Sequence, residues 1–393
     1  MHGEDAAAFV EKNIRACSHC KSVGVYVHIP FCLQKCNYCD FLSFADVSGA
    51  EKYVESLLNE ICMASQQHIV ACSHYKNVHS LVGTRLNTVY IGGGTPTALP
   101  SLLLCKILDK VQQFPLTPDV EITVEANPGT LNREYQQALK AHGVNRLSLG
   151  LQTTHSHLLA AINRAHSMED FLENYHTACE IGFDNINIDL MFALPGQTIA
   201  DWQKTLQEII ALSPAHISAY SLTPAENTPL WESLEKGGLT LPTDDIDRAM
   251  YHMAIELLTN AGYIHYELSN FAKPGFESRH NVNCWRCVPY YAFGLGAHSF
   301  DGQKRWRNTA SMAKYLEGDY APRDVVCLTD AERLSEEIIL GLRLTLGIPE
   351  KLPDVQIVEN LIGKGLLTRQ NGFVKLTPKG LDLANLVFEA FLV

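Results

Sequence analysis

Short β-rich runs alternate with segments of helical length over the first 225 residues, and this alternation limits the possible folds more than any other feature. The β-rich runs cover residues 23–29, 86–91, 120–125, 146–151, 185–191 and 217–222. Apolar residues at helical spacing mark the segments between them, at 51–64, 99–112, 132–141, 168–181 and 202–212. Strand-helix alternation implies parallel strands with helices outside, either curled as a barrel or open as a doubly wound sheet.

Polar residues and glycines gather where these predicted strands end. In both architectures, functional residues lie at the carboxyl ends of the strands. The strand ends carry Cys32, Cys36, Cys39, residues 92–96 (Gly-Gly-Gly-Thr-Pro), Glu125, Gln152 and Asp189. One edge of the sheet is therefore expected to hold the candidate site.

Composition narrows the class of protein. Apolar types make up 46% and charged types 19% of the 393 residues, which excludes a disordered chain and a multispanning membrane protein. The formal net charge of -12 repels nucleic-acid phosphate, so nucleic acid is not an expected partner. The N-terminus lacks the pattern of a secretory signal, and a reducing cytoplasm, where clustered cysteines bind metals, is the expected compartment.

The remaining segments are less regular. Residues 65–85 and 224–247 are predicted to be irregular loops. After residue 327 the sequence predicts helices at 329–346 and 353–365 and then a hairpin, because Asn371-Gly372 stands between apolar alternations. Helices followed by a hairpin resemble a winged helix. The acidity of the chain favours a structural appendage there over a DNA-binding domain.

Three cysteines, Cys32, Cys36 and Cys39, stand within eight residues directly after the first strand. One interpretation is a zinc site with His28 or a distant cysteine as the fourth ligand. The other is an iron-sulfur cluster, in which three thiolates leave one iron without a protein ligand and open to reaction. Structural zinc sites usually have two ligand pairs, and the sequence supplies no clean second pair.

The spacing Cys-x3-Cys-x2-Cys is the signature of radical S-adenosylmethionine (SAM) proteins. The longer string Tyr26-Val-His-Ile-Pro-Phe-Cys32, continuing as Lys35-Cys36-Asn-Tyr-Cys39-Asp40-Phe41, resembles the oxygen-independent coproporphyrinogen III oxidase family, and within it the branch of HemW-type haem chaperones. The resemblance covers about residues 22–390. It implies a [4Fe-4S] cluster on the three cysteines, SAM on the fourth iron, and reductive cleavage of SAM to a 5'-deoxyadenosyl radical.

The same resemblance implies a set of SAM contacts: Tyr26, Tyr38, Gly93, Gly94, Thr95, Glu125, Gln152, Arg164 and Asp189. The two tyrosines are expected beside the nucleoside and the cluster, and residues 93–95 beside the methionine part. These residue types suit such roles. Glycine lets backbone N–H groups approach a ligand closely, and a carboxylate such as Asp189 can accept hydrogen bonds from a ribose diol. A helix cap is the alternative role for Asp189.

Two functions share these motifs. An oxidase would decarboxylate two propionates of coproporphyrinogen III to vinyl groups, whereas a chaperone would bind haem and transfer it to acceptor haemoproteins, including membrane cytochromes. Three departures from the oxidases favour the chaperone. Asp40-Phe41 follows the third cysteine in place of Gly-Cys, the oxidases' long N-terminal arm has no counterpart, and residues 279–285 resemble the chaperones' His-Asn-x-x-Tyr-Trp motif.

His280 in that motif is the expected haem ligand, because neutral imidazole is a standard axial ligand. Cys284 stands where the motif has Tyr, which leaves open a thiolate ligand or a redox pair with Cys287. A homodimer is also left open, as is peripheral docking at a membrane.

These expectations divide the chain into four parts. They are an N-terminal extension (1–21), a radical SAM partial (β/α)6 barrel (22–225), a barrel-covering region with the His-Asn motif (226–326) and a C-terminal helical, winged-helix-like domain (327–393).

Overall fold

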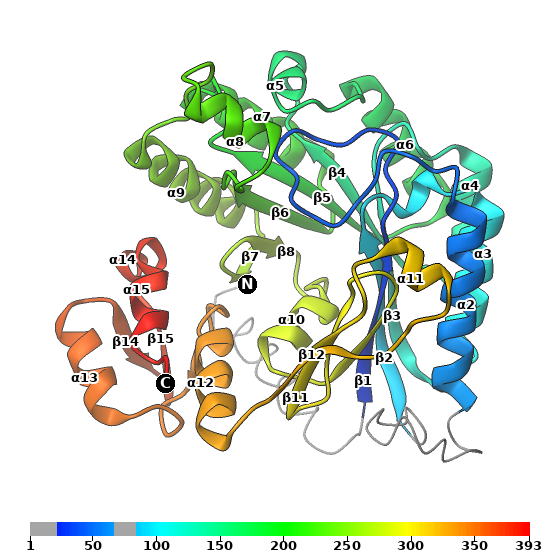
Figure 1. The fold of residues 1–393 in the computed structure, drawn as a ribbon. Coiled ribbons are helices and arrows are strands. Elements are labelled where there is room, and N and C mark those ends of the chain that lie inside the picture. Colours follow the sequence, from blue (N-terminus) through cyan, green and yellow to red (C-terminus); the bar gives the residue numbers. More distant parts are fainter. Residues whose placement is uncertain (1–21, 67–83) are drawn as a thin grey trace.

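Six parallel strands form the centre of the molecule in the computed structural model, which describes residues 22–66 and 84–393. The strands are β1 (Ser22–Ile29), β2 (Arg85–Gly93), β3 (Leu116–Ala126), β4 (Arg146–Gln152), β5 (Asn185–Phe192) and β6 (His216–Ser221). Each pairs with the strand that follows it in sequence, so the sheet curls as a partial barrel (Figure 1). The six predicted strands and the barrel architecture are confirmed.

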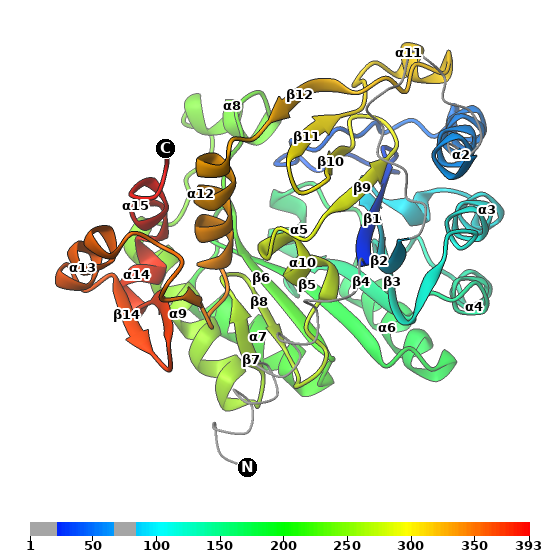
Figure 2. The ribbon, with the colours of Figure 1, turned by 90° about the horizontal axis from the view of Figure 1, so that it is seen from below.

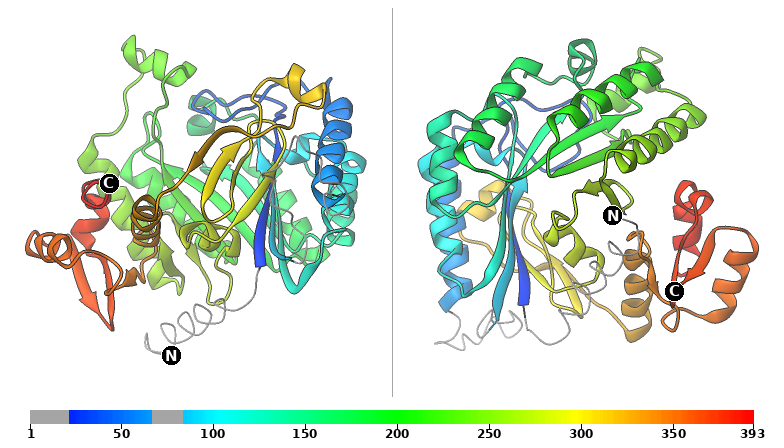
Figure 3. Two further views of the ribbon diagram at one scale, coloured as in Figure 1. Left: turned by 60° about the horizontal axis from the view of Figure 1, so that its bottom comes forward. Right: turned by 180° about the vertical axis from the view of Figure 1, so that it is seen from behind.

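Helices cover the outer face of this sheet (Figure 3). They are α2 (Ala50–Gln66), α3 (Ser101–Val111), α4 (Arg133–Ala141), α5 (Ser156–Ala161), α6 (Met168–Ile181) and α7 (Ile199–Leu212), and a short 3-10 turn, η1 (Pro96–Ala98), precedes α3. Capping boxes begin two of them, with Ser167 before α6 and Thr198 before α7. Such caps satisfy backbone N–H groups that have no partner within the helix.

Side chains alternate across each strand, and this alternation separates an apolar layer from a polar interior. Leu147, Leu149 and Leu151 of β4 join the apolar core beneath the helices. Arg146 and Ser148 of the same strand face the other way, into the barrel. The inner face of the barrel is therefore built to hold polar groups.

Further strands extend the sheet on both sides. On one side these are β9 (Tyr290–Phe293), β10 (His298–Phe300), β11 (Lys304–Arg307) and β12 (Arg323–Cys327), and on the other β8 (Asn270–Ala272) and β7 (Ile264–Glu267). β9 runs parallel to β1, whereas the other five pairings are antiparallel. Among the described residues, β1 and β6 do not pair with each other, so the barrel stays open. The helix α10 (Arg279–Trp285) lies across the amino ends of the central strands (Figure 2).

A buried carboxylate ties the β9–α11 segment to the outer helices, where α11 is Met312–Leu316. Glu60 of α2 accepts hydrogen bonds from the Gly294 backbone N–H (2.9 Å), the Asn308 amide (2.6 Å) and the Tyr315 hydroxyl (2.6 Å). Burial raises the pKa of Glu60 to about 7, even though these three donors favour the ionised form.

The structure corrects two predictions of local structure. Residues 224–247 are not an irregular loop, because they contain α8 (Pro229–Glu235) and the start of α9 (Asp244–Asn260). Thr228 caps α8 by accepting the Trp231 backbone N–H, and proline occupies the first turn. The predicted helix at 329–346 is α12 (Asp330–Gly341), which ends five residues earlier. The loop at 65–85 lies almost entirely outside the described residues.

The C-terminal elements pack around a separate apolar cluster that includes Leu342, Leu361 and Val374. They comprise α12, β13 (Ile348–Pro349), α13 (Val355–Gly363), β14 (Leu367–Gln370), β15 (Phe373–Leu376), α14 (Pro378–Asp382) and α15 (Ala384–Glu389). The predicted hairpin is confirmed, with Asn371 (φ 53°) and Gly372 (φ 80°) both left-handed, as a two-residue turn requires.

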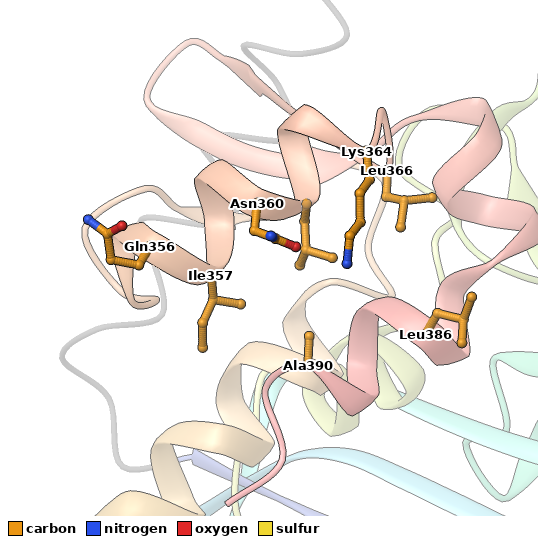
Figure 4. A pocket seen from close by; sticks show the side chains of 8 residues that line it. Gln356, Ile357, Asn360, Lys364, Leu366, Leu386 and Ala390 are labelled. Carbon is orange, nitrogen blue, oxygen red and sulfur yellow. The ribbon is translucent and has the colours of Figure 1, made fainter.

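A groove of about 480 Å³ opens between α13 and α15 (Figure 4). Apolar side chains such as Ile357 and Leu386 line it together with Lys364. Within the described residues, no helix combines the length and apolar character needed to cross a membrane.

Candidate cofactor site

The three clustered cysteines lie in the loop between β1 and α2, at the carboxyl end of the barrel. A backbone bridge between Phe31 and Phe44 folds this loop back on itself, and the Cys32 N–H donates to the Phe44 carbonyl (2.9 Å). Cys32 is buried, while Cys36 and Cys39 are half-buried. The loop therefore fixes the first thiol against the protein and leaves the other two nearer to solvent.

A chain of hydrogen bonds joins the first two cysteines across the strand ends. The Thr95 hydroxyl donates to Cys32 Sγ (3.6 Å), and the Asn127 amide donates to Thr95 Oγ1 (2.8 Å). Arg164 Nη2 donates to Asn127 Oδ1 (2.7 Å), while Arg164 Nη1 donates to Cys36 Sγ (3.4 Å). We refer to these contacts as the Cys32–Cys36 chain. It brings Thr95 and Arg164, both predicted site residues, into contact with the predicted cluster ligands.

The donors around these sulfurs suit thiolates rather than packed thiols. A hydroxyl and a guanidinium aimed at sulfur stabilise its anionic form, which is the form that binds iron. Burial raises the pKa of Cys39, so that thiol stays protonated until a metal displaces its proton. Among residues 22–66 and 84–393, no three His, Cys, Asp or Glu side chains converge on a single ion position. In an iron-sulfur cubane each thiolate binds its own iron, so such convergence is not required.

His28, the fourth ligand in the zinc interpretation, is already engaged. Its Nδ1 accepts a hydrogen bond from the Tyr26 hydroxyl (3.0 Å), and its Nε2 donates to the Leu42 carbonyl (2.9 Å). Both ring nitrogens therefore have protein partners, and the geometry does not support a zinc ligand here.

Glu125 lies at the end of β3 and receives two hydrogen bonds inside the barrel. The Tyr90 hydroxyl donates to Oε1 (2.7 Å) and the Gly93 N–H donates to Oε2 (3.0 Å). Burial raises the pKa of Glu125 to about 7. A Cβ on Gly92 would come within 2.7 Å of this carboxyl, so the neighbouring glycine provides the space for it.

The glycine run acts differently from the sequence expectation. The Gly94 N–H donates to the Ile29 carbonyl (2.8 Å) and the Thr95 N–H to the Phe31 carbonyl (2.6 Å), while the Gly93 N–H is bound to Glu125. These N–H groups therefore already have protein partners, and the predicted contact of residues 93–95 with SAM stays a prediction. The glycines permit close packing instead, because a Cβ on Gly94 would lie 2.6 Å from the Phe31 oxygen.

Gln152 and Asp189 both lie on the barrel side of their strands. Gln152 ends β4 with a left-handed backbone (φ 72°) and is buried. Asp189 accepts hydrogen bonds from the Ser148 hydroxyl (3.1 Å) and the Asn187 amide (2.8 Å). It is therefore not a helix cap, and its carboxylate faces the interior next to β4.

The two predicted tyrosines flank this region. Tyr26 stacks on Tyr90 with ring centroids 6.2 Å apart, below the cysteine loop. Tyr38 lies in the loop itself and packs against an apolar cluster that includes Leu194 and Leu222. Burial, and then the neighbouring Cys36, raise the pKa of Tyr38, so its hydroxyl stays neutral.

Comparison with known proteins accounts for this arrangement. Residues 26–209 match the family model of the Radical SAM superfamily, and residues 328–383 match the HemN C-terminal domain. Heme chaperone HemW of Bacillus subtilis (strain 168) is 36% identical, covering 94% of this chain and 99% of the relative. The chain belongs to the HemW family. Heme chaperone HemW of Escherichia coli (strain K12) is 33% identical, covering 94% and 98% of the two chains.

A solved structure shows the same fold over nearly the whole chain. Coproporphyrinogen III oxidase (HemN) from Escherichia coli, described as a radical SAM enzyme, superposes with a TM-score of 0.79 at 22% identity. The match covers 97% of this chain and 93% of that one. The predicted family and fold class are thus confirmed.

The structure places His280 of this HemW family member far from the cysteine loop. The residue lies in α10 beneath the barrel and is only 7% exposed. Its Nδ1 shares a hydrogen bond with the Thr88 hydroxyl (3.0 Å), and its ring lies 5.0 Å from that of Tyr90. Burial lowers the pKa of His280 to about 4, so the ring is neutral. A haem on the outer surface could not reach it.

Cys284 and Cys287 do not have the character of reactive thiols. Burial raises the pKa of each to about 11, which disfavours the thiolate that both alternatives require. Cys17 and Cys20 lie outside the described residues.

Two residues in the barrel were missed by sequence reasoning. Asn127, directly after β3, is the central link of the Cys32–Cys36 chain. Arg146, the first residue of β4, is buried in the interior. The only available signal was their position at strand ends, which does not distinguish a polar residue that faces the interior from one that faces solvent.

Proposed function

We propose that this protein binds haem and transfers it to acceptor haemoproteins, and that it carries a [4Fe-4S] cluster and SAM. The observation that carries this proposal is the similarity to relatives named heme chaperones, at 32–37% identity over most of both chains. Asp40-Phe41 after the third cysteine, in place of the oxidases' Gly-Cys, supports the same assignment.

We propose that Cys32, Cys36 and Cys39 hold the cluster, with SAM on the open iron. When bound, these groups supply one-electron reduction and radical chemistry. The chain's own residues prepare the site for them. Arg164 offsets negative charge on Cys36 and Thr95 donates to Cys32. Asn127 orients both groups, because it donates a hydrogen bond to Thr95 and accepts one from Arg164.

The barrel interior supplies the groups proposed to bind SAM. Asp189 is a half-buried hydrogen-bond acceptor suited to a ribose diol, and Glu125 is a second acceptor beside Gly93. Tyr26 stacks on Tyr90 of the neighbouring strand, and its ring is proposed to pack against the base. Gln152 and residues 93–95 complete the proposed contacts. Tyr38, in the cysteine loop itself, is the proposed contact beside the cluster.

His280 remains the proposed haem ligand only for haem that enters the barrel. Its Nδ1 is engaged by Thr88, so Nε2 is the nitrogen left for iron. Membrane cytochromes as acceptors, docking at a membrane surface and a homodimer also stay proposals.

An anaerobic haem titration of the cluster-reconstituted protein, followed by gel filtration, tests the function. We expect a saturable Soret band at about one haem per chain that survives the column and moves to an added apo-haemoprotein. His280→Ala should weaken binding, whereas His142→Ala, on the outer surface, should not.

The competing function is oxidation of coproporphyrinogen III. Anaerobic incubation of the same preparation with coproporphyrinogen III, SAM and a reductant distinguishes the two. Decarboxylated product without stable haem binding would overturn the chaperone proposal and establish the oxidase in its place.

A further inference from the structure

Arg146 is a buried cation without a hydrogen-bond or ion-pair partner in the described part of the chain. Its side chain is 2% exposed at the start of β4, and its Nε has no hydrogen-bond acceptor. Among the described residues, no carboxylate forms an ion pair with it and no oxygen accepts a hydrogen bond from its guanidinium. An unpaired buried charge is strongly destabilising, so such a residue is expected to have a partner that enters the site.

Its neighbours in the sheet share this lack of partners. The register aligns Arg146 with Thr123 of β3 on one side and with Asn185 of β5 on the other. Thr123 Oγ1 and Asn185 Oδ1 are also buried and find no hydrogen-bond partner among the residues that the structure describes. Three adjacent strands thus present unsatisfied polar atoms at one level of the barrel.

The acidic groups nearest to Arg146 are engaged elsewhere. Glu125 accepts from Tyr90 and Gly93, and Asp189 accepts from Ser148 and Asn187. Neither carboxylate forms an ion pair with Arg146 among the described residues, although the charge of Arg146 acts to lower the pKa of Glu125 against the larger effect of burial.

The histidines around Arg146 are neutral. Burial and the positive charge of Arg146 lower the pKa of His280 to about 4 and that of His216 well below its usual value. His216 is bonded to Asn187 and Tyr266, and neither ring carries charge at neutral pH. Of Arg146, His216 and His280, only Arg146 therefore carries a positive charge, and this charge favours the binding of an anion.

Several side chains that face the barrel interior above Arg146 are partly exposed. Tyr26, Tyr90 and Asp189 face the interior and are half-buried, and Tyr220 at the end of β6 is 39% exposed. A ligand that enters from the carboxyl ends of the strands would meet these partly exposed side chains before Arg146.

We propose that Arg146 binds a carboxylate of the ligand that occupies the barrel, and that this carboxylate is a haem propionate. The identification of the ligand as haem rests on the function proposed above. A guanidinium matches a carboxylate bidentately, and Thr123 Oγ1 supplies a further hydrogen-bond donor at the same level. A small free carboxylate could bind Arg146 through the same contacts, and the second measurement below tests for it.

Esterified haem provides a direct test. We compare haem with its dimethyl ester, which lacks both carboxylates, in the wild type and in Arg146→Met. Arg133→Met, which removes an exposed arginine paired with Glu180, is the matched control. The wild type and the control should prefer haem over the ester by roughly tenfold, and Arg146→Met should lose this preference while its affinity for the ester is unchanged. An equal preference in all three proteins would overturn the proposal.

A second measurement separates this proposal from haem binding itself. Sodium propionate should raise the melting temperature of the wild type above that in equal sodium chloride, and Arg146→Met should show no such difference. If the wild type binds neither haem nor ester, the chaperone function fails, while the propionate arm still decides whether Arg146 is a carboxylate site. A propionate shift of equal size in wild type and variant would overturn the site.

Stability without ligand is the third readout. Removing an unpaired buried charge should leave the melting temperature of Arg146→Met equal to or above that of the wild type. A lower melting temperature, or failure of Arg146→Met to fold, would overturn the premise that the guanidinium lacks a partner. Arg146→Lys is a second variant in the haem and ester comparison, with a reduced preference for haem expected because ammonium cannot bind bidentately.

Discussion

Replacing Asn127 with alanine breaks the Cys32–Cys36 chain at its centre. The substitution removes one hydrogen bond between neutral groups, to Thr95, and one from the charged guanidinium of Arg164. A neutral hydrogen bond contributes about 1 kcal/mol and one to a charged group about 1.5–3 kcal/mol, so the loss is about 3 kcal/mol in total. Arg164 keeps its contacts with the Gly150 carbonyl and Cys36 Sγ, which limits the cost of leaving it without Asn127.

The assay is the rate at which a chelator removes iron from the reconstituted protein. Without Asn127 the hydroxyl and guanidinium that face the two sulfurs are no longer held in place, and we expect iron loss to accelerate by roughly tenfold. Asn145→Ala is the matched control. It also removes two side-chain hydrogen bonds, to the Ile122 N–H and the Val120 carbonyl, but lies away from the cysteines.

Both variants should unfold at lower urea concentration than the wild type, yet only Asn127→Ala should release iron faster. Equal rates of iron release in the two variants would refute the reasoning, because the chain would then contribute to general stability and not to the cluster.

Three further predictions concern the site and its surroundings. Gly94→Ala places a Cβ 2.6 Å from a backbone oxygen of the cysteine loop and should lower the free energy of urea unfolding by about 1–3 kcal/mol. In Gly49→Ala the new Cβ meets no atom within 4 Å, so this control should not be destabilised. Equal urea midpoints for the two variants would contradict this. Because burial raises the pKa of Glu60 from 4.5 to about 7, the folded chain holds a proton that the unfolded chain releases, so the contribution of Glu60 to stability falls as pH rises through that window. Glu60→Gln should flatten the dependence of the urea midpoint on pH. If the slope of midpoint against pH is unchanged in this variant, the pH dependence comes from other groups. Cys36→Ala should abolish iron binding and the brown absorbance after reconstitution. Cys105→Ala, in the buried face of α3, should keep both. Retention of full iron in Cys36→Ala would contradict the assignment of the cluster to these cysteines.

Local pattern was sufficient for the central fold. Alternation of β-rich and helical segments predicted all six parallel strands, and the Asn371-Gly372 pair predicted its hairpin, because both signals depend on neighbouring residues only. The prediction for 224–247 was wrong because its Pro and Gly content was read as a loop, whereas Pro229 after Thr228 begins a helix.

For the site, too, some features follow from the sequence alone and others only from the tertiary structure. The sequence by itself determined which residues stand at the strand ends, since the cysteine spacing and the glycine run are properties of short segments. Only the tertiary structure decided which of their atoms have partners, because those partners come from other strands. It engaged the N–H groups of residues 93–95, occupied both nitrogens of His28 and linked two cysteines through Asn127. It also left Arg146 buried without a hydrogen-bond partner among residues 22–66 and 84–393, which depends on the side chains that other strands bring to the polar interior.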